Sequence, residues 1–232
     1  MSDLLFPAPP VSAVPVRGRR ERVPIHRIFC VGRNYEAHAR EMGVAVDRDA
    51  PFYFTKSAVH YAPSGATVPY PPGTGNYHYE MELVVVIGRD AFRVPADRAL
   101  DCVFGYACGL DMTRRDVQLA AREQRRPWDL AKDVEGSAVI AEIVPATECG
   151  RLGEGSIELR VNGDTKQQSD LSLLIHGVPD IVAHLSTYYH LRPGDVIFTG
   201  TPEGVGPVQP GDRLDGSIAG VGTIAIGIGP AS

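Results

Sequence analysis

The chain has 232 residues, of which 44% are hydrophobic, and this length is enough to bury one sizeable core within a single domain. Its 23 basic and 28 acidic residues give a formal net charge of -5, which argues against a positively charged surface for nucleic acid. No apolar run approaches the roughly 20 residues of a membrane-spanning helix, and the amino terminus has no uninterrupted apolar segment of the kind found in signal peptides. We therefore expect a cytoplasmic protein that binds neither nucleic acid nor membranes.

The amino-terminal residues 1–24 contain five prolines and an arginine-rich stretch between Arg17 and Arg22. Because proline fixes φ and has no backbone N–H, we expect an extended or strand-like arm that packs on the main body. Residues 25–232 are expected to form one domain. The four cysteines form no C-x-x-C pair, and free thiols are typical of proteins in a reducing cytosol.

Short β-branched runs, separated by many of the 25 glycines and 19 prolines, predict short strands joined by turns. In chain order, the predicted strands cover residues 27–31, 51–55, 80–87, 102–110, 156–161, 196–199 and 222–228. The predicted helices cover residues 35–42, 113–124 and 179–189. We expect Asn34 to cap the first helix, and Thr113 with Asp116 to form a capping box at the second. This order predicts an α+β fold that is mainly β, with a few short helices.

The most informative segment is the predicted strand that contains Glu80 and Glu82. A strand has a period of two residues, so both carboxylates lie on the same face. Asp111 follows the next apolar strand, where a helix begins. Three carboxylates without a Cys or His pattern are typical of a hard cation such as Mg²⁺ rather than of zinc. Each acid also has a simpler interpretation, since Glu80 and Glu82 suit a solvent-facing edge strand and Asp111 suits a helix cap.

Short sequence blocks in a fixed order extend from about Ile28 to near the C-terminus. They are Gly32-Arg33-Asn34-Tyr35 with His38, Phe54-Thr55-Lys56, Glu80-x-Glu82, Gly109-Leu110-Asp111-Met112-Thr113 with Arg115 and Gln118, Pro127-Trp128 with Lys132, Val161-Asn162-Gly163, and Thr199-Gly200-Thr201-Pro202-x-Gly204-Val205-Gly206. Together they resemble the fumarylacetoacetate hydrolase family, most closely its acylpyruvate hydrolase branch. The resemblance implies a mixed β-sandwich roll in which residues 25–232 are the catalytic domain, a divalent metal (Mg²⁺ or Mn²⁺) and a homodimer.

The resemblance also assigns roles to individual residues. It implies metal binding by Glu80, Glu82 and Asp111, substrate binding by Arg33, Arg115, Gln118 and Thr201, and catalysis by His38, Glu41 and Lys132. On a helix His38 and Glu41 are three residues apart and therefore neighbours, so the carboxylate can orient the imidazole as a general base for water. From spacing alone, an exposed surface ion pair is the better interpretation of these two residues. We expect Trp128, Tyr188 and Tyr189 to be core or interface aromatics.

The activity that the resemblance implies is hydrolysis of a carbon–carbon bond in a 2,4-dioxo acid during the catabolism of aromatic compounds. The expected substrate is fumarylpyruvate, and the expected products are fumarate and pyruvate. Oxaloacetate decarboxylation and cleavage of another acylpyruvate are the enzymatic alternatives, and a catalytically silent dimeric binding protein is the alternative of another class. Departures from the pattern at Ser57 and at residues 133–139 leave the distal acyl group open.

Overall fold

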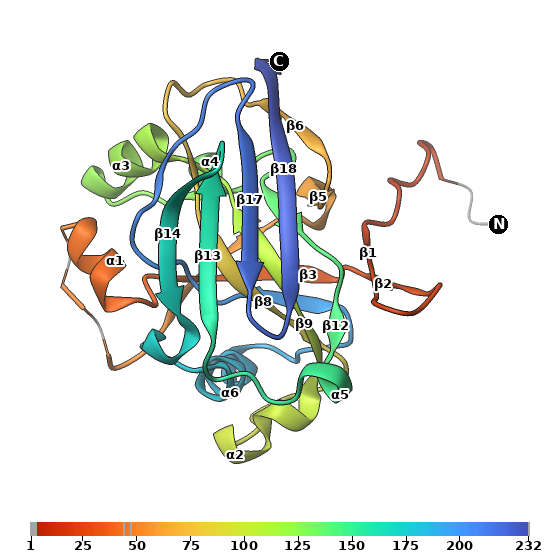
Figure 1. The fold of residues 1–232 in the computed structure, drawn as a ribbon. Helices are drawn as coiled ribbons and strands as arrows, with labels where there is room; N and C mark the ends of the chain where they lie inside the picture. The colour runs from red at the N-terminus through yellow and green to blue at the C-terminus, as the bar shows by residue number, and fades with distance from the viewer. Residues whose placement is uncertain (1–3, 44, 47, 232) are drawn as a thin grey trace.

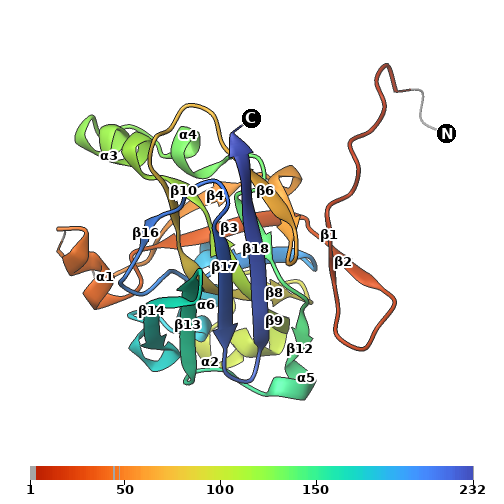
Figure 2. The same ribbon diagram turned by 45° about the horizontal axis from the view of Figure 1, so that its top comes forward.

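The computed structural model describes residues 4–43, 45–46 and 48–231. Within these residues strands predominate and the helices are short, so the prediction of a mainly β, α+β fold is confirmed. Two curved sheets lie one over the other (Figure 1). Side chains from both sheets form the larger hydrophobic core between them. Helices lie around the edges of this sandwich, as a second view shows (Figure 2).

The larger sheet is mixed and has eight strands among the described residues. Its strands, in spatial order, are β4 (Phe52–Lys56), β3 (Arg27–Gly32), β15 (Asp195–Phe198), β8 (Met81–Ile87), β9 (Val103–Asp111), β11 (Ala138–Ile140) and β5 (Tyr61–Pro63), and β12 (Val144–Pro145) also pairs with β9. The pairs β3–β15 and β5–β11 are parallel, whereas β8 and β9 are antiparallel. The long pair β8–β9 therefore lies at the centre of the sheet.

The remaining strands form three smaller sheets. The second layer of the sandwich consists of β14 (Asp164–Asp170), β13 (Ser156–Val161), β17 (Arg213–Ile218), β18 (Gly222–Ala231) and β6 (Thr67–Tyr70). A small sheet joins β10 (Thr113–Arg114), β7 (Tyr77–Tyr79) and β16 (Gly206–Pro207), and a two-stranded sheet joins β1 (Ala13–Pro15) to β2 (Arg22–Pro24). In the small three-stranded sheet, β7 lies just before Glu80 in the chain, β10 lies just after Asp111, and β16 begins at the end of the 199–206 loop. The sheet therefore brings these three segments side by side.

The α-helices have 4 to 11 residues each. They are α1 (Glu36–Glu41), α2 (Ala96–Ala99), α3 (Arg115–Glu123), α4 (Asp129–Lys132), α5 (Ala146–Cys149) and α6 (Val178–Tyr188). Short 3-10 turns are η1 (Ala58–His60), η2 (Leu100–Cys102) and η3 (Leu171–Leu173). No helix in the described part of the chain is long and apolar enough to span a membrane.

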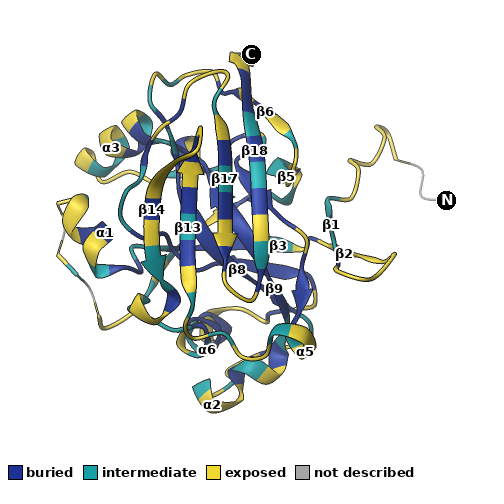
Figure 3. Cartoon of the chain, viewed as in Figure 1, coloured by how far each residue is buried: buried dark blue, intermediate teal, exposed yellow. Residues whose placement is uncertain are grey.

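Strand β8 is apolar at nearly every position because both of its faces are buried (Figure 3). Leu83 and Val85 belong to the core between the two sheets, whereas Val84 and Val86 belong to a second apolar cluster on the opposite face. With a period of two, Glu82 lies on the face of Val84 and Val86. The carboxylates therefore project away from the main core, at the end of a strand that packing fixes on both sides.

The amino-terminal segment contributes to that second cluster. Val14 is fully buried and Val16 is 3% exposed, and both belong to the apolar cluster that includes Val84. The backbone N–H of Arg17 donates to the carbonyl of Ile143 at 2.9 Å. By contrast, residues 4–11 are exposed and extend away from the sandwich (Figure 1, Figure 3). Strand β1 thus covers one face of the larger sheet.

Two predicted helix caps are wrong. Tyr35, not Asn34, is the N-cap of α1, and it makes no side-chain capping bond. The Asn34 amide instead donates to the carbonyls of His176 and Thr199, at 2.9 and 2.8 Å, and so ties three loops together. Helix α3 begins at Arg115 after the short strand β10, so no capping box forms. For Asn34 long-range contacts replace the local bond that the motif predicts, whereas the Thr113 hydroxyl donates to the carbonyl of Asp111 at 3.1 Å.

Candidate metal centre and active site

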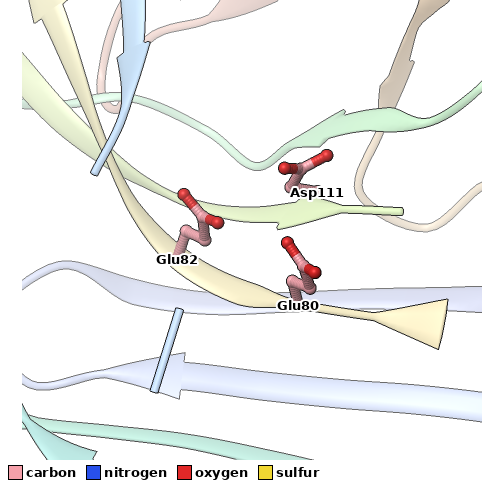
Figure 4. A group of neighbouring side chains, drawn as sticks. All are labelled: Glu80, Glu82 and Asp111. Atoms are coloured by element: carbon pink, nitrogen blue, oxygen red, sulfur yellow. The ribbon is translucent and has the colours of Figure 1, made fainter. Parts of the chain in front are cut away.

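The three predicted metal ligands come together at one end of β8 and β9 (Figure 4). Glu80 directly precedes β8, Glu82 lies within it, and Asp111 ends β9. The backbone N–H of Asp111 donates to the carbonyl of Glu80 at 2.9 Å. One oxygen from each carboxylate lies within 4.8 Å of the others, and all three residues are buried. The simpler interpretations, as solvent-facing acids and a helix cap, are therefore wrong.

Buried ammonium and guanidinium groups surround this triad. Lys132 Nζ lies 2.7 Å from both Glu80 Oε2 and Asp111 Oδ2, and Arg115 forms an ion pair with Glu80. Burial lowers the pKa of Lys132, but the charges of Asp111 and Glu80 raise it more, so the net shift is upward. Burial likewise raises the pKa of Glu80, and the charges of Lys132 and Arg115 reverse this, so the net shift is downward. Glu80 and Lys132 are therefore both charged at neutral pH.

Glu82 is the carboxylate of the triad that has no cationic side chain as an ion-pair partner among the described residues. Its Oε2 accepts a hydrogen bond from the backbone N–H of Gly200 at 2.6 Å. Burial, followed by the negative charges of Asp111 and Glu80, raises the pKa of Glu82 well above its ordinary value. A cation placed between the three carboxylates removes this penalty.

The donor set of the triad fits a divalent metal ion. Asp111 Oδ1 is buried, and it forms an ion pair with Lys56 Nζ at 2.9 Å but accepts no hydrogen bond within the described structure. Hard divalent cations such as Mg²⁺ prefer carboxylate oxygens, and no thiolate belongs to this cluster of described residues. Glu80, Glu82 and Asp111 can therefore hold a divalent metal and leave further coordination positions for other oxygen ligands.

Helix α1 carries the predicted base. His38 Nδ1 lies 3.2 Å from Glu41 Oε2, and the His38 side chain is only 7% exposed. Both carboxylate oxygens of Glu41 also accept from the backbone N–H of Gly204, at 3.1 and 3.3 Å. The hydrogen bond from His38 is the largest influence that lowers the pKa of Glu41. The pair is thus held against the 199–206 loop. The imidazole is buried and the Glu41 side chain is 35% exposed, so the interpretation as an exposed surface pair does not hold for His38.

Helix α3 presents one face to the site. Arg115 and Gln118 are buried at i and i+3, and the Arg115 guanidinium donates to the Gln118 side-chain oxygen. Because its guanidinium also pairs with Glu80, Arg115 is not the solvated surface charge that its residue type alone suggests. The amide of Gln118 is therefore held in a fixed position beside the triad.

The glycine-rich 199–206 loop is held from the second sheet. The amide of Gln167 donates to Thr201 Oγ1 at 2.8 Å and to the carbonyl of Pro202 at 2.9 Å. Its side-chain oxygen accepts from the backbone N–H of Met81 at 3.0 Å. Gln167 thus ties the loop to the start of β8, next to Glu80 and Glu82.

Most of these side chains line one pocket. Of the ten predicted site residues, eight line it, namely Arg33, His38, Glu80, Glu82, Arg115, Gln118, Lys132 and Thr201. The other two do not line the pocket: Asp111 belongs to the triad, and Glu41 is hydrogen-bonded to His38. Trp128 is only partly buried and also lines the pocket, so it is not a core aromatic of this chain, and its place at an interface stays a prediction. Tyr188 is 70% exposed and does not belong to the core of this chain.

Sequence reasoning missed three residues that position the site or line it. Gln167 and Lys56 are buried, and Lys56 Nζ donates to the carbonyl of Met112 at 3.1 Å and to Ser137 Oγ at 2.7 Å. Arg122 lines the same pocket as the triad. Two of the three could have been found from the sequence. Lys56 is a lysine at the end of an apolar strand, and Arg122 has the spacing from Arg115 that places both on one face of a helix. No local pattern marks Gln167.

The family of the chain follows from comparisons with known proteins. The family model described as fumarylacetoacetate (FAA) hydrolase, C-terminal, matches residues 27–228. A fumarylpyruvate hydrolase from Ralstonia sp. is 55% identical over 192 residues, covering 82% of this chain and 100% of that protein. A mitochondrial oxaloacetate tautomerase from Homo sapiens is 41% identical over 194 residues, covering 84% of this chain and 87% of that protein.

A solved structure agrees as well. The crystal structure of fumarylpyruvate hydrolase from Pseudomonas aeruginosa, in complex with Mn²⁺ and pyruvate, superposes with a TM-score of 0.95 at 44% identity. It covers 98% of this chain and 100% of its own. The family model, the relatives and this structure agree on one family. The chain therefore belongs to the fumarylacetoacetate hydrolase family.

Proposed function

We propose that this protein is a metal-dependent hydrolase that cleaves fumarylpyruvate into fumarate and pyruvate. The observation that carries the proposal is that one pocket joins the acidic triad to the buried His38, which is hydrogen-bonded to Glu41. The 55% identity with a fumarylpyruvate hydrolase supports the substrate. The reaction consumes one water, which adds OH to the fumaryl carbonyl carbon and a proton to the pyruvyl carbon.

The pyruvyl end of the substrate belongs near the triad. Arg115 and the amide of Gln118 offer hydrogen-bond donors to its carboxylate, and Thr201 offers a hydroxyl. Glu80, Glu82 and Asp111 would hold a divalent cation, either Mg²⁺ or Mn²⁺, which would supply positive charge to polarise the 2-keto group. Side chains on two strands and one helix would thus orient the scissile bond before reaction.

His38 is the proposed general base. When Nδ1–H donates to Glu41, the neutral imidazole leaves Nε2 unprotonated to take a proton from water. The negative charge of Glu41 stabilises the imidazolium that results. Breakage of the carbon–carbon bond leaves an electron pair on the pyruvyl fragment, and the ammonium of Lys132 stabilises that charge as an enolate. A proton then converts the enolate to pyruvate.

Oxaloacetate tautomerisation is the second candidate function. The observation that favours it is the 41% identity with a relative that carries that name. Oxaloacetate is also a 2-oxo acid whose enol form bears negative charge, so the triad and Lys132 suit both substrates. Tautomerisation breaks no carbon–carbon bond, and the products distinguish the two reactions.

The remaining expectations belong to the same proposal. We place the enzyme in the cytoplasm, where its four free cysteines, three of them buried, stay reduced. We also propose that it acts as a homodimer in the catabolism of aromatic compounds. Its amino-terminal segment would be an arm on a single catalytic domain of residues 25–232.

Metal removal tests the proposed function. The purified protein is expected to lose activity on fumarylpyruvate after treatment with EDTA and to recover it with Mg²⁺ or Mn²⁺. Assays with fumarylpyruvate, acetylpyruvate and oxaloacetate, each monitored through the ultraviolet absorbance of the substrate, measure substrate choice. Equal activity with and without chelation would contradict the metal-dependent mechanism, and absence of turnover on all three would favour a silent binding protein.

A further inference from the structure

Two arginines at the outer end of the pocket have no carboxylate partner within the described residues. Arg33 makes no ion pair with any described residue, and its guanidinium lies 5.1 Å from the ring centroid of Phe52 and 5.7 Å from that of Trp128. Within the described part of the chain, Arg122 donates one hydrogen bond, to the carbonyl of Met42 at 3.1 Å. Both line the pocket that contains the triad. Two cations in one pocket without compensating charge favour an anionic occupant.

The two guanidiniums also repel each other. Burial lowers the pKa of Arg33, and the charge of Arg122 lowers it further. Arg33 is held at this place by a left-handed backbone conformation, with φ of 58°, directly before Asn34 anchors the loop. Met42 and Leu119 line the wall nearby and give the outer end of the pocket an apolar part. An anion between the two arginines therefore relieves repulsion in a partly desolvated place.

Helix α3 sets the distance between the two ends of the pocket. Arg115, Gln118, Leu119 and Arg122 follow the i, i+3, i+4, i+7 pattern of one helical face, and all four line the pocket. With a rise of about 1.5 Å per residue, Arg115 and Arg122 are separated by roughly 10 Å along the helix axis. In an extended seven-carbon diacid the carboxyl carbons lie roughly 7 to 8 Å apart, given C–C bonds of about 1.5 Å. With a hydrogen bond added at each end, such a diacid can reach from Arg115 to Arg122.

We propose that Arg33 and Arg122 form a binding site for a distal carboxylate, so that the enzyme selects 2,4-dioxo acids that carry a second carboxylate at the end of the acyl chain. This inference rests on the proposed function and names its substrate class. Arg115 binds the pyruvyl end, and Arg122, two turns further along α3, binds the other end. Dioxo monoacids lack the group that these two arginines recognise.

The test compares Arg122→Met with the matched control Arg125→Met, an exposed residue just after α3 that does not line the pocket. For Arg122→Met, kcat/KM for fumarylpyruvate is expected to fall about 10- to 100-fold, mainly through KM, as for the loss of a charge-assisted hydrogen bond. With acetylpyruvate, which ends in a methyl group, the fall is expected to be at least about tenfold smaller. Arg125→Met keeps the wild-type ratio between the two substrates, and thermal melts confirm that both variants fold.

The outcomes separate this inference from the proposed function. An equal loss on both substrates, or no loss on fumarylpyruvate, would overturn the distal carboxylate site while hydrolysis by the wild-type protein still stands. If the metal-loaded wild-type protein cleaves neither substrate, the proposed function itself fails. Partial recovery of the substrate ratio in Arg122→Lys, which restores the charge but not the planar fork, would support the assignment.

Discussion

Replacing Glu82 with glutamine is expected to lower the turnover of fumarylpyruvate by at least about 1000-fold, because charge stabilisation by a metal contributes several kcal/mol and each 1.4 kcal/mol is about tenfold. Glutamine keeps an oxygen that can accept from the N–H of Gly200, so the fold is preserved. Calorimetric titration with Mn²⁺ should show a matching loss of affinity. Glu154→Gln, at an exposed site away from the pocket, is the control.

The metal-free variant should also be more stable than the metal-free wild type. Burial and two neighbouring carboxylates raise the folded-state pKa of Glu82, so the folded protein holds this proton more tightly than the unfolded chain does. Stability is therefore lost as the pH rises from the ordinary glutamate pKa, about 4.3, towards the raised value. Above that pH window, the melting temperature of Glu82→Gln in EDTA should be several degrees higher than that of the wild type in EDTA. An unchanged Mn²⁺ affinity in this variant would contradict the metal centre.

Replacing His38 with alanine is expected to lower kcat for hydrolysis by about 100- to 10,000-fold, which is the usual contribution of a general base. The affinity for Mn²⁺ should stay close to that of the wild type, because His38 is not one of the three clustered carboxylates. Glu41→Gln should give a smaller loss, since it keeps an oxygen for His38 Nδ1 but removes the charge that stabilises the imidazolium.

The same variant distinguishes hydrolysis from decarboxylation of oxaloacetate, the enzymatic alternative that the sequence left open. Hydrolysis requires deprotonation of water, so it should fall with His38, whereas decarboxylation of oxaloacetate requires no activated water and should persist if it occurs at all. Steady-state assays of both substrates with wild type and His38→Ala measure the difference. Full hydrolytic activity in His38→Ala would remove His38 from the mechanism.

The central part of the fold could be predicted from the sequence because its signals are local. The run of apolar residues in β8 indicates a strand buried on both faces, and its period of two places Glu80 and Glu82 together. Asp111 joined them through the pairing of β8 with β9, an antiparallel neighbour along the larger sheet. The family match confirmed the resemblance that connected these acids.

Other features depend on long-range contacts, which a sequence pattern does not contain. Asn34 has the residue type of a helix cap, yet its amide binds segments more than 140 residues away. Gln167 lies in a polar edge strand, and only the packing of the two sheets shows that its amide reaches Thr201. Trp128 resembles a core aromatic by size, but the fold places it at the pocket. Residue types predicted the chemistry of the centre better than the contacts that position it.

The most direct test of the central claim is analysis of the products of fumarylpyruvate by ¹H NMR with metal-loaded protein. The proposed mechanism predicts one fumarate and one pyruvate for each substrate molecule consumed, in a reaction that stops when the metal is chelated. Recovery of only the enol and keto forms of the unchanged substrate would contradict hydrolysis by this site.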